Sequence, residues 1–223
     1  MRIKDHYRGN PLPVEKKHCP PDPPIVRPLV FRMVYQMVEL RIELDGVFMK
    51  SKPNIALMGM AGVGKSFIGQ QIAAISEYET METDTLIAAQ AIQEGTAYND
   101  LSDADFLRIE KDVFTNMGDL SGTVIDMGAS VIYDRDIMEK IAGFAHIVYI
   151  RDGIDVIESR FNARGPVPLM GIAGKTFEQL FAERQPLYER YAEITVTRNS
   201  LRDHDALRIA EEILQLFRDD AGQ

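Results

Sequence analysis

Cysteine and histidine are scarce in this 223-residue sequence. Its single cysteine, Cys19, cannot form a disulfide within the chain, which fits a reducing compartment, and we interpret it as an incidental thiol. The four histidines are scattered, with no spacing typical of metal ligands (His6, His18, His146 and His204). We therefore expect no zinc site.

Basic residues and long apolar runs are also lacking. Lys and Arg number 25 against 34 Asp and Glu, for a net charge of −9 and a pI near 5.0. This balance argues against a nucleic-acid partner, although a small anion could still bind in a locally basic pocket. Met1–Asn10 lacks the apolar core of a secretory signal, and the most apolar stretch, Leu29–Met49, carries five charged residues. We expect a soluble, cytoplasmic protein that does not enter membranes.

Prolines concentrate near the start of the chain. Seven of the eleven lie at or before Pro28, which favours extended or irregular backbone there. Apolar residues then recur at helical spacing over Leu29–Val47, so we predict one helix. Residues 1–52 would form an N-terminal extension, and residues 53–223 a domain of ordinary size. The added helix could pack on that domain, or it could form a homodimer or partner contact.

Short apolar runs and helical patterns alternate from Asn54 onward. The predicted strands are Ile55–Met58, Glu79–Glu82, Thr123–Asp126, His146–Ile150 and Ile194–Thr197. The predicted helices are Gly64–Ser76, Thr85–Gln93, Ser102–Met117, Ile154–Ala163, Thr176–Tyr191 and Asp203–Phe217. Ser102 with Asp105 forms a capping signal. Strands that alternate with helices predict an α/β domain whose parallel sheet is covered on both faces.

Residues 59–66 read GMAGVGKS, which satisfies the phosphate-loop pattern G-x-x-x-x-G-K-[ST]. Glycines let the backbone turn so that its N–H groups point at phosphate oxygens, and the following helix directs its positive N-terminus there. Lys65 would reach the β- and γ-phosphates of ATP, and the Ser66 hydroxyl would bind Mg²⁺. The predicted nucleotide-binding residues of this segment are Gly59, Ala61, Gly62, Val63, Gly64, Lys65, Ser66 and Phe67.

Three segments resemble the shikimate kinase family. Residues 59–69 (GMAGVGKSFIG) resemble its phosphate loop and first helix, and residues 82–84 (ETD) its acidic strand end. Residues 181–189 (FAERQPLYE) resemble its E-R-x-P-L-Y-E helix, which is the motif most specific to the family. The resemblance covers about 54–223. It implies a nucleoside-kinase-like, three-layer fold with a five-stranded parallel sheet, a lid over ATP at about 164–175, and a flap that binds the acceptor.

The resemblance also implies roles for individual residues. Asp84 would bind the acceptor hydroxyl and help to deprotonate it, and Arg184 would grip an acceptor carboxylate. Glu82 would stand near the Mg²⁺ shell, Arg160 would pack against adenine, and Arg164 would serve as the catalytic lid arginine. The implied cofactors are ATP and Mg²⁺, and the implied acceptor is a small hydroxylated acid.

The sequence departs from the family at three positions of the acceptor half and lid. Leu107 follows Phe106 where the family has a substrate-binding arginine, and Arg108 comes one residue later, which turns a helical side chain by about 100°. Residues 127–129 read MGA in place of three glycines, which leaves Gly128 as the predicted acceptor contact. Val167 stands where the lid arginine is expected, so Arg164 is the substitute.

For four acidic residues, the sequence allows both a role in the site and a purely structural role. Asp84 lies just past the second predicted strand, where sites form in parallel sheets, but it could instead cap the helix from Thr85. Asp126 ends an apolar strand, which is typical of a Mg²⁺ partner, but it could be a buried hydrogen-bonding group. Glu82 has the same two interpretations. Glu110 could orient an arginine or lie on a solvated helix face.

The sequence likewise allows two roles for each of two basic residues, Arg184 and Lys175. Arg184 could bind the acceptor, or it could pair with Glu183 or Glu189 on its own helix. Lys175 could reach a phosphate from the lid, or it could be solvated. The chain as a whole is then either an active ATP-dependent kinase of a small hydroxylated acid, or a weakened kinase that binds ATP as a regulatory or nucleotide-sensing module.

Overall fold

The computed structural model describes residues 52–163, 169–198 and 205–220. The chain divides between Met49 and Lys50, and the described residues all lie in the second unit, Lys50–Gln223. The predicted helix at 29–47 and the homodimer contact lie outside the described residues, as do Arg164 and Val167. The domain boundary at residue 52 stays a prediction.

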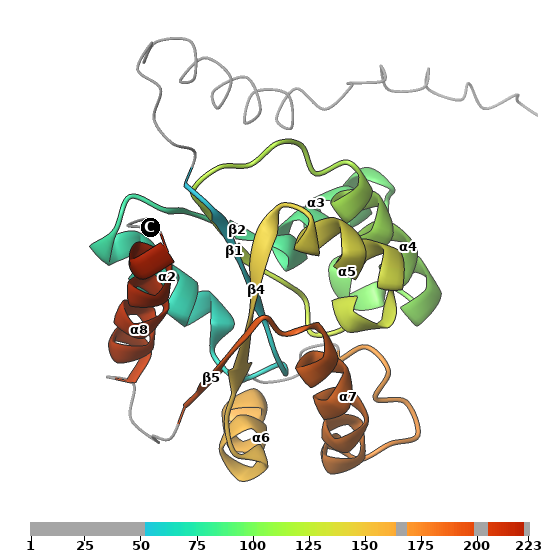
Figure 1. Cartoon of the computed structure of the whole chain (residues 1–223). Helices are drawn as coiled ribbons and strands as arrows, with labels where there is room; N and C mark the ends of the chain where they lie inside the picture. The colour runs from blue at the N-terminus through green and yellow to red at the C-terminus, as the bar shows by residue number, and fades with distance from the viewer. Residues whose placement is uncertain (1–51, 164–168, 199–204, 221–223) are drawn as a thin grey trace, which may run out of the picture. The chain divides into compact units, whose positions relative to one another are not determined.

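Five parallel strands form one sheet in the order β2-β3-β1-β4-β5, which confirms the predicted fold class (Figure 1). Their bounds are β1 Asn54–Met58, β2 Glu79–Glu82, β3 Thr123–Asp126, β4 Ala145–Arg151 and β5 Ile194–Thr197. The central strand β1 is buried at every position, as expected of a parallel strand covered on both faces.

The connections of the sheet place a site at the carboxyl ends of its middle strands. The chain passes from β1 to the edge strand β2, whereas from β3 it crosses β1 to reach β4. Connections that leave in opposite directions open a crevice beyond the strand ends, where α/β proteins bind ligands. Asp126 pairs in register with Leu57 of β1 and with Glu82 of β2, so three strand ends meet there.

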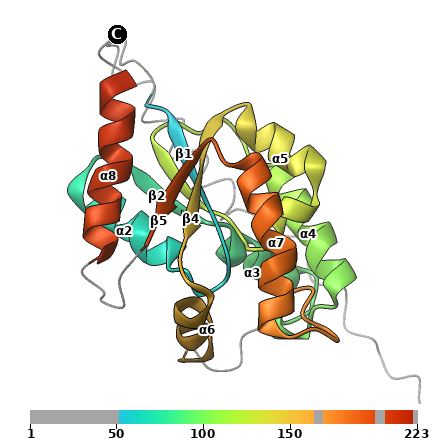
Figure 2. The same ribbon diagram turned by 60° about the horizontal axis from the view of Figure 1, so that its bottom comes forward.

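Helices cover the sheet on both faces. Figure 1 shows α2 and α8 on one side, α3, α4 and α5 on the other, and α6 and α7 toward one end of the domain. In Figure 2, α7 lies on the same side as α4 and α5. The bounds are α2 Lys65–Ile75, α3 Thr83–Gln93, α4 Asp103–Thr115, α5 Arg135–Ala142, α6 Ile154–Ala163, α7 Phe177–Tyr191 and α8 Asp205–Asp220, with short 3₁₀ turns η1 Tyr98–Asp100 and η2 Val131–Tyr133. Among the described helices, none is long and apolar enough to cross a membrane.

Side-chain caps mark the starts of three helices, α4, α5 and α7. The Ser102 side chain accepts a hydrogen bond from the Asp105 N–H, which confirms the predicted cap of α4. Thr176 and Gln179 form a reciprocal capping box at the start of α7. Helix α5 was not predicted, because it has only eight residues; its start is capped by Asp134, which accepts from the Ile137 N–H.

Candidate functional site

The loop between β1 and α2 is shaped by glycines. Gly59 and Gly62 have φ values of 150° and 92°, a region that side chains rarely adopt. A Cβ would lie 2.6 Å from the Ile150 carbonyl oxygen at Gly59, and 2.8 Å from that of Ile157 at Gly62. The loop therefore packs backbone to backbone and leads directly into α2, the arrangement that a polyphosphate requires.

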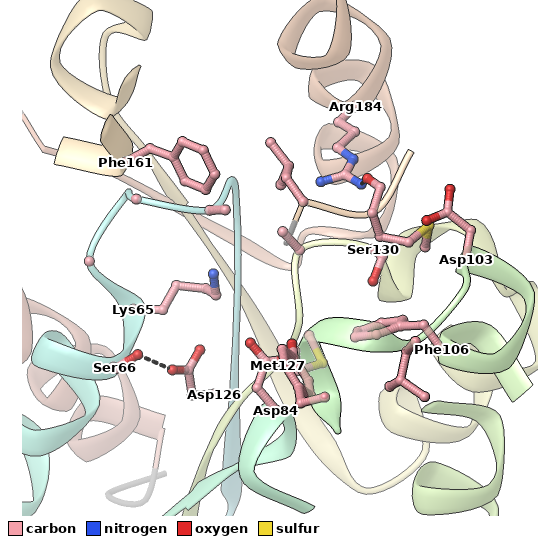
Figure 3. A pocket seen from close by; sticks show the side chains of 18 residues that line it. Lys65, Ser66, Asp84, Asp103, Phe106, Asp126, Met127, Ser130, Phe161 and Arg184 are labelled. Carbon is pink, nitrogen blue, oxygen red and sulfur yellow. Dashed lines mark hydrogen bonds between the residues drawn. The ribbon is translucent and has the colours of Figure 1, made fainter. Parts of the chain in front are cut away.

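Two side chains at the start of α2 carry polar groups into the loop region. Lys65 is 8% exposed, and its Nζ donates to the Gly59 carbonyl at 3.1 Å, so the ammonium lies across the loop. Ser66 Oγ donates to Asp126 Oδ2 at 2.5 Å, as the dashed line in Figure 3 marks. The structure thus brings together the loop, its lysine and the acid that ends β3.

A cavity of about 240 Å³ extends from this loop to α7 (Figure 3). Eight of the predicted site residues line it: Ala61, Gly62, Gly64, Lys65, Ser66, Asp84, Asp126 and Arg184. Met127 and Ala129, which the sequence placed at the acceptor surface, also line it. Eight further residues line it that the sequence did not assign to the site: Tyr98, Leu101, Asp103, Phe106, Ser130, Phe161, Leu169 and Met170. The predicted residues Gly59, Val63, Phe67, Glu82, Gly128 and Arg160 do not line this cavity.

Asp84 is the second residue of α3, which begins at Thr83 with Glu82 at the N-cap position. The alternative that Asp84 caps a helix from Thr85 is therefore wrong. Thr83, which the sequence did not single out, fixes this junction: its Oγ1 donates to the Asp126 carbonyl at 3.1 Å and accepts from the Gly128 N–H at 3.0 Å. Asp84 is consequently held at the cavity, close to the end of β3.

Arg184 is fully buried and faces the far end of the cavity from α7 (Figure 3). Its Nε donates to the Tyr133 hydroxyl at 3.2 Å and its Nη2 to the Met170 carbonyl at 2.6 Å, while Nη1 has no hydrogen-bond partner. The predicted alternative, a pair with Glu183 or Glu189, is wrong, because Glu183 accepts from Lys175 and Tyr133 and Glu189 accepts from Gln185. Lys175, for which the sequence left open a phosphate contact or a solvated position, donates to Glu183 Oε2.

Glu110 is buried in α4, so the alternative of a solvated helix face is wrong. Its Oε1 accepts from Ser130 Oγ at 3.1 Å, and its Oε2 has no partner. Burial, opposed in part by the Ser130 hydrogen bond, raises the pKa of Glu110 to about 8. At neutral pH this carboxyl is therefore mostly protonated.

Among the described residues, neither position 107 nor position 108 brings an arginine to the cavity. Leu107 is 37% exposed and does not line the cavity. Arg108 cannot substitute, because its guanidinium binds Glu94 with an Nη2–Oε2 distance of 2.5 Å on the outside of α4. Met127, by contrast, is buried and lines the cavity, so the departure from the first of the three glycines adds a side chain to the cavity wall.

Arg160 and Val63, both predicted to bind the nucleotide, have hydrogen-bond partners that the sequence did not indicate. Arg160 Nη1 donates to Asp152 Oδ2 at 2.9 Å, and the next residue, Phe161, lines the cavity beside the loop. Arg198 is buried, and its Nη1 donates to the Val63 carbonyl at 2.9 Å from the end of β5. The packing of Arg160 against adenine stays a prediction, as does a metal role for Glu82, which pairs in register with Asp126.

Comparison with known proteins agrees with this geometry. The family model for shikimate kinase matches residues 61–217. A shikimate kinase of Vibrio cholerae is 27% identical over 172 residues, which is 76% of this chain and 97% of that protein. One of Mannheimia succiniciproducens is 27% identical over 173 residues, again 76% of this chain and 97% of that protein.

Solved structures show the same fold. Shikimate kinase from Acinetobacter baumannii in complex with shikimate superposes with a TM-score of 0.63 at 22% identity, over 76% of this chain and 94% of that one. Shikimate kinase from Aquifex aeolicus superposes with a TM-score of 0.57 at 21% identity, over 75% of this chain and 98% of that one. The family model spans more than half of the chain, so the chain belongs to the shikimate kinase family, whose members are phosphotransferases that act on a hydroxyl group.

Proposed function

We propose that the protein transfers the γ-phosphate of ATP to a hydroxyl of a small hydroxylated carboxylic acid, shikimate or an analogue. The observation that carries the proposal is one cavity with a phosphate loop at one end and Arg184 at the other, with Asp84 also on its wall. Phosphoryl transfer needs positioning and charge neutralisation more than covalent help from the protein, and these residues can supply both.

The nucleotide end has groups that fit ATP and Mg²⁺. Backbone N–H groups of the loop and the Lys65 ammonium would hold the phosphates, and the Ser66 hydroxyl with the Asp126 carboxylate would hold the metal. Mg²⁺ usually takes one or two protein oxygens and completes its shell with phosphates and water. Bound Mg²⁺ would neutralise charge on the transferring phosphate.

At the acceptor end, Asp84 would accept the proton of the attacking hydroxyl. Arg184 would bind the acceptor carboxylate through Nη1, the nitrogen that lacks a partner. Gly128 would leave room for Asp84 from behind the cavity wall, because a Cβ there would lie 3.1 Å from Asp84 Oδ1. Arg164 and the rest of the lid would close over the phosphates, and Arg160 would pack on adenine.

The test is an ADP-release assay with Mg-ATP and, in turn, shikimate and other hydroxylated carboxylic acids. We expect at least one acid to stimulate release well above the rate without acceptor, and Lys65→Ala to abolish that stimulation. Tight binding of ATP with no stimulation by any acid would contradict the proposal and favour a regulatory protein that only binds nucleotide.

The remaining expectations concern the extension and the cellular setting. Residues 1–52 would add a helix through which two chains associate, and the protein would act in the cytoplasm. Deletion of residues 1–52 should then leave ATP binding intact but shift the chain from dimer to monomer in analytical ultracentrifugation. If the full chain and the shortened chain have the same association state, the proposed dimer is contradicted.

A further inference from the structure

The three nitrogens of the Arg184 guanidinium have different surroundings. Nε donates to the Tyr133 hydroxyl at 3.2 Å and Nη2 to the Met170 carbonyl at 2.6 Å, whereas Nη1 has no hydrogen-bond partner among the described residues. A guanidinium is planar and rigid, so hydrogen bonds from two of its nitrogens fix both its plane and its rotation. Nη1 is therefore held in one orientation at the cavity.

The two groups that hold the guanidinium differ in kind. Met170 contributes a backbone carbonyl, which any residue at that position would supply. Tyr133 contributes a side-chain hydroxyl, and its ring also faces the guanidinium, with 5.3 Å between Arg184 Cζ and the ring centroid. Cation–π attraction acts at such a distance. Tyr133 is thus the partner whose contribution depends on the type of residue.

A second hydrogen bond orients the Tyr133 hydroxyl. It donates to Glu183 Oε1 at 2.6 Å, while Glu183 Oε2 accepts from Lys175 Nζ at 2.6 Å. The hydrogen bonds from Lys175 and Tyr133 lower the pKa of Glu183, so its carboxylate stays ionised and able to accept. Because the hydroxyl proton points to Glu183, the lone pairs of the oxygen are left to accept from Arg184 Nε.

Tyr133 reaches Arg184 from outside the cavity. It ends the short turn η2, where its N–H donates to the Ser130 carbonyl at 3.0 Å and the two preceding residues, Val131 and Ile132, are buried. Tyr133 itself is 38% exposed and does not line the cavity. An effect of Tyr133 on a bound acceptor would therefore pass through Arg184.

We propose that Tyr133 is a positioning residue for acceptor binding: its hydroxyl, oriented by Glu183, holds the Arg184 guanidinium so that Nη1 is directed to the acceptor carboxylate. This inference rests on the proposed function, because it concerns the residue that binds the acceptor of the same phosphoryl transfer. Tyr133 lies outside the three segments that resemble the shikimate kinase family, so no motif singled it out.

The first experiment is Tyr133→Phe, which removes the hydroxyl and keeps the ring. We expect KM for the acceptor acid to rise by about threefold to tenfold and KM for ATP to change little, because one hydrogen bond to a charged group is lost while the Met170 contact stays. Tyr191→Phe is the matched control. Tyr191 also has an arginine over its ring, with Arg190 Cζ 5.7 Å from the centroid, but it does not line the cavity.

A double-mutant cycle tests whether Tyr133 acts through Arg184. In the Arg184→Gln background the guanidinium is absent, so adding Tyr133→Phe should change KM for the acceptor by less than about twofold. A residue with an independent structural role would raise this KM by the same factor in both backgrounds. Additive effects would therefore overturn the positioning role.

NMR measures the contact without turnover. The Arg184 Nε–Hε signal can be assigned by its loss in Arg184→Gln. Its exchange with water should be about tenfold faster in Tyr133→Phe than in the unaltered chain, because the proton loses its acceptor. Tyr191→Phe should keep the slow exchange. Equal exchange rates in Tyr133→Phe and the unaltered chain would show that the hydroxyl does not hold the guanidinium, and would overturn the inference.

The outcomes separate this inference from the proposed function. Turnover of an acid with the same acceptor KM in Tyr133→Phe and the unaltered chain would overturn the role of Tyr133 and leave the kinase proposal standing. No turnover of any acid in the panel would overturn the proposed function and, with it, the acceptor role given to Tyr133. The exchange rate of Nε–Hε would still show in that case whether the hydroxyl holds the guanidinium.

Discussion

Ser66 Oγ donates a hydrogen bond to Asp126 Oδ2 at 2.5 Å, which joins the first turn of α2 to the end of β3. The two oxygens belong to segments 60 residues apart, yet they meet where the loop ends. Since Mg²⁺ prefers such oxygens, a bound ion would replace this hydrogen bond with two contacts of its own.

Under the proposed function, Asp126→Asn should raise the Mg²⁺ concentration needed for half-maximal ADP release by about tenfold or more, because the carboxylate proposed to bind Mg²⁺ loses its charge. Titration of Mg²⁺ at fixed ATP measures this directly. Asp119→Asn is the control, because Asp119 is exposed in the loop before β3. An unchanged Mg²⁺ requirement in Asp126→Asn would favour the alternative of a purely structural, hydrogen-bonding aspartate.

Lys65→Ala and Asp84→Asn should fail in different ways. Lys65 would contact phosphates, so its loss should weaken ATP binding and remove turnover. Asp84 would act on the acceptor, so Asp84→Asn should keep ATP affinity while kcat falls by about two orders of magnitude or more, as is typical for loss of a general base. Calorimetry with Mg-ATP and the ADP-release assay separate the two effects. A near-normal kcat in Asp84→Asn would show that another group takes the proton.

The phosphate loop could be predicted from the sequence because all its requirements lie within eight consecutive residues. Glycines supply the backbone freedom, and Lys65 and Ser66 follow at fixed spacing. The strands were equally clear, since their apolar runs are short and bounded. Helix α5 was missed because eight residues give too few repeats to reveal a period, and its start depends on the Asp134 cap.

The acceptor end could be predicted only in part, because its contacts join distant segments. Arg184 was singled out by a motif, but its partners Tyr133 and Met170 lie 51 and 14 residues away. Glu110 reads as one acidic residue in an amphipathic helix, whereas in the structure it is buried and accepts a hydrogen bond from Ser130, 20 residues later. No local sequence pattern indicates that Arg184 Nη1 lacks a hydrogen-bond partner or that the Glu110 carboxyl is buried.

Arg184→Gln should raise KM for the acceptor acid by about tenfold to a hundredfold and change KM for ATP little, because the charge-assisted contact to the carboxylate is lost. Steady-state kinetics with both substrates varied measures the split. Arg190→Gln is the matched control, since Arg190 lies on the same helix but is exposed. Circular dichroism would check that Arg184→Gln folds. Equal increases in both KM values would contradict an acceptor role.

Glu110 should make the stability of the protein depend on pH. Burial raises its pKa to about 8 in the folded protein, against about 4.3 in an unfolded chain. Between these values the folded state binds more protons than the unfolded state, so the free energy of unfolding should fall as pH rises from about 4 to about 8. Each unit of difference in pKa corresponds to about 1.4 kcal/mol, so the full effect could reach several kcal/mol.

Glu110→Gln removes the titrating group but keeps an oxygen that can accept from Ser130, so this variant should lose most of that decline. Urea unfolding at pH 5, 7 and 9 gives the free energy for each protein, and Glu211→Gln, at an exposed position of α8, should retain the slope of the unaltered chain. The difference between the unaltered chain and Glu110→Gln should grow toward pH 9, because only the unaltered chain must then either keep a proton or bury a charge. Parallel curves for the two proteins would mean that Glu110 is already ionised and compensated in the folded state.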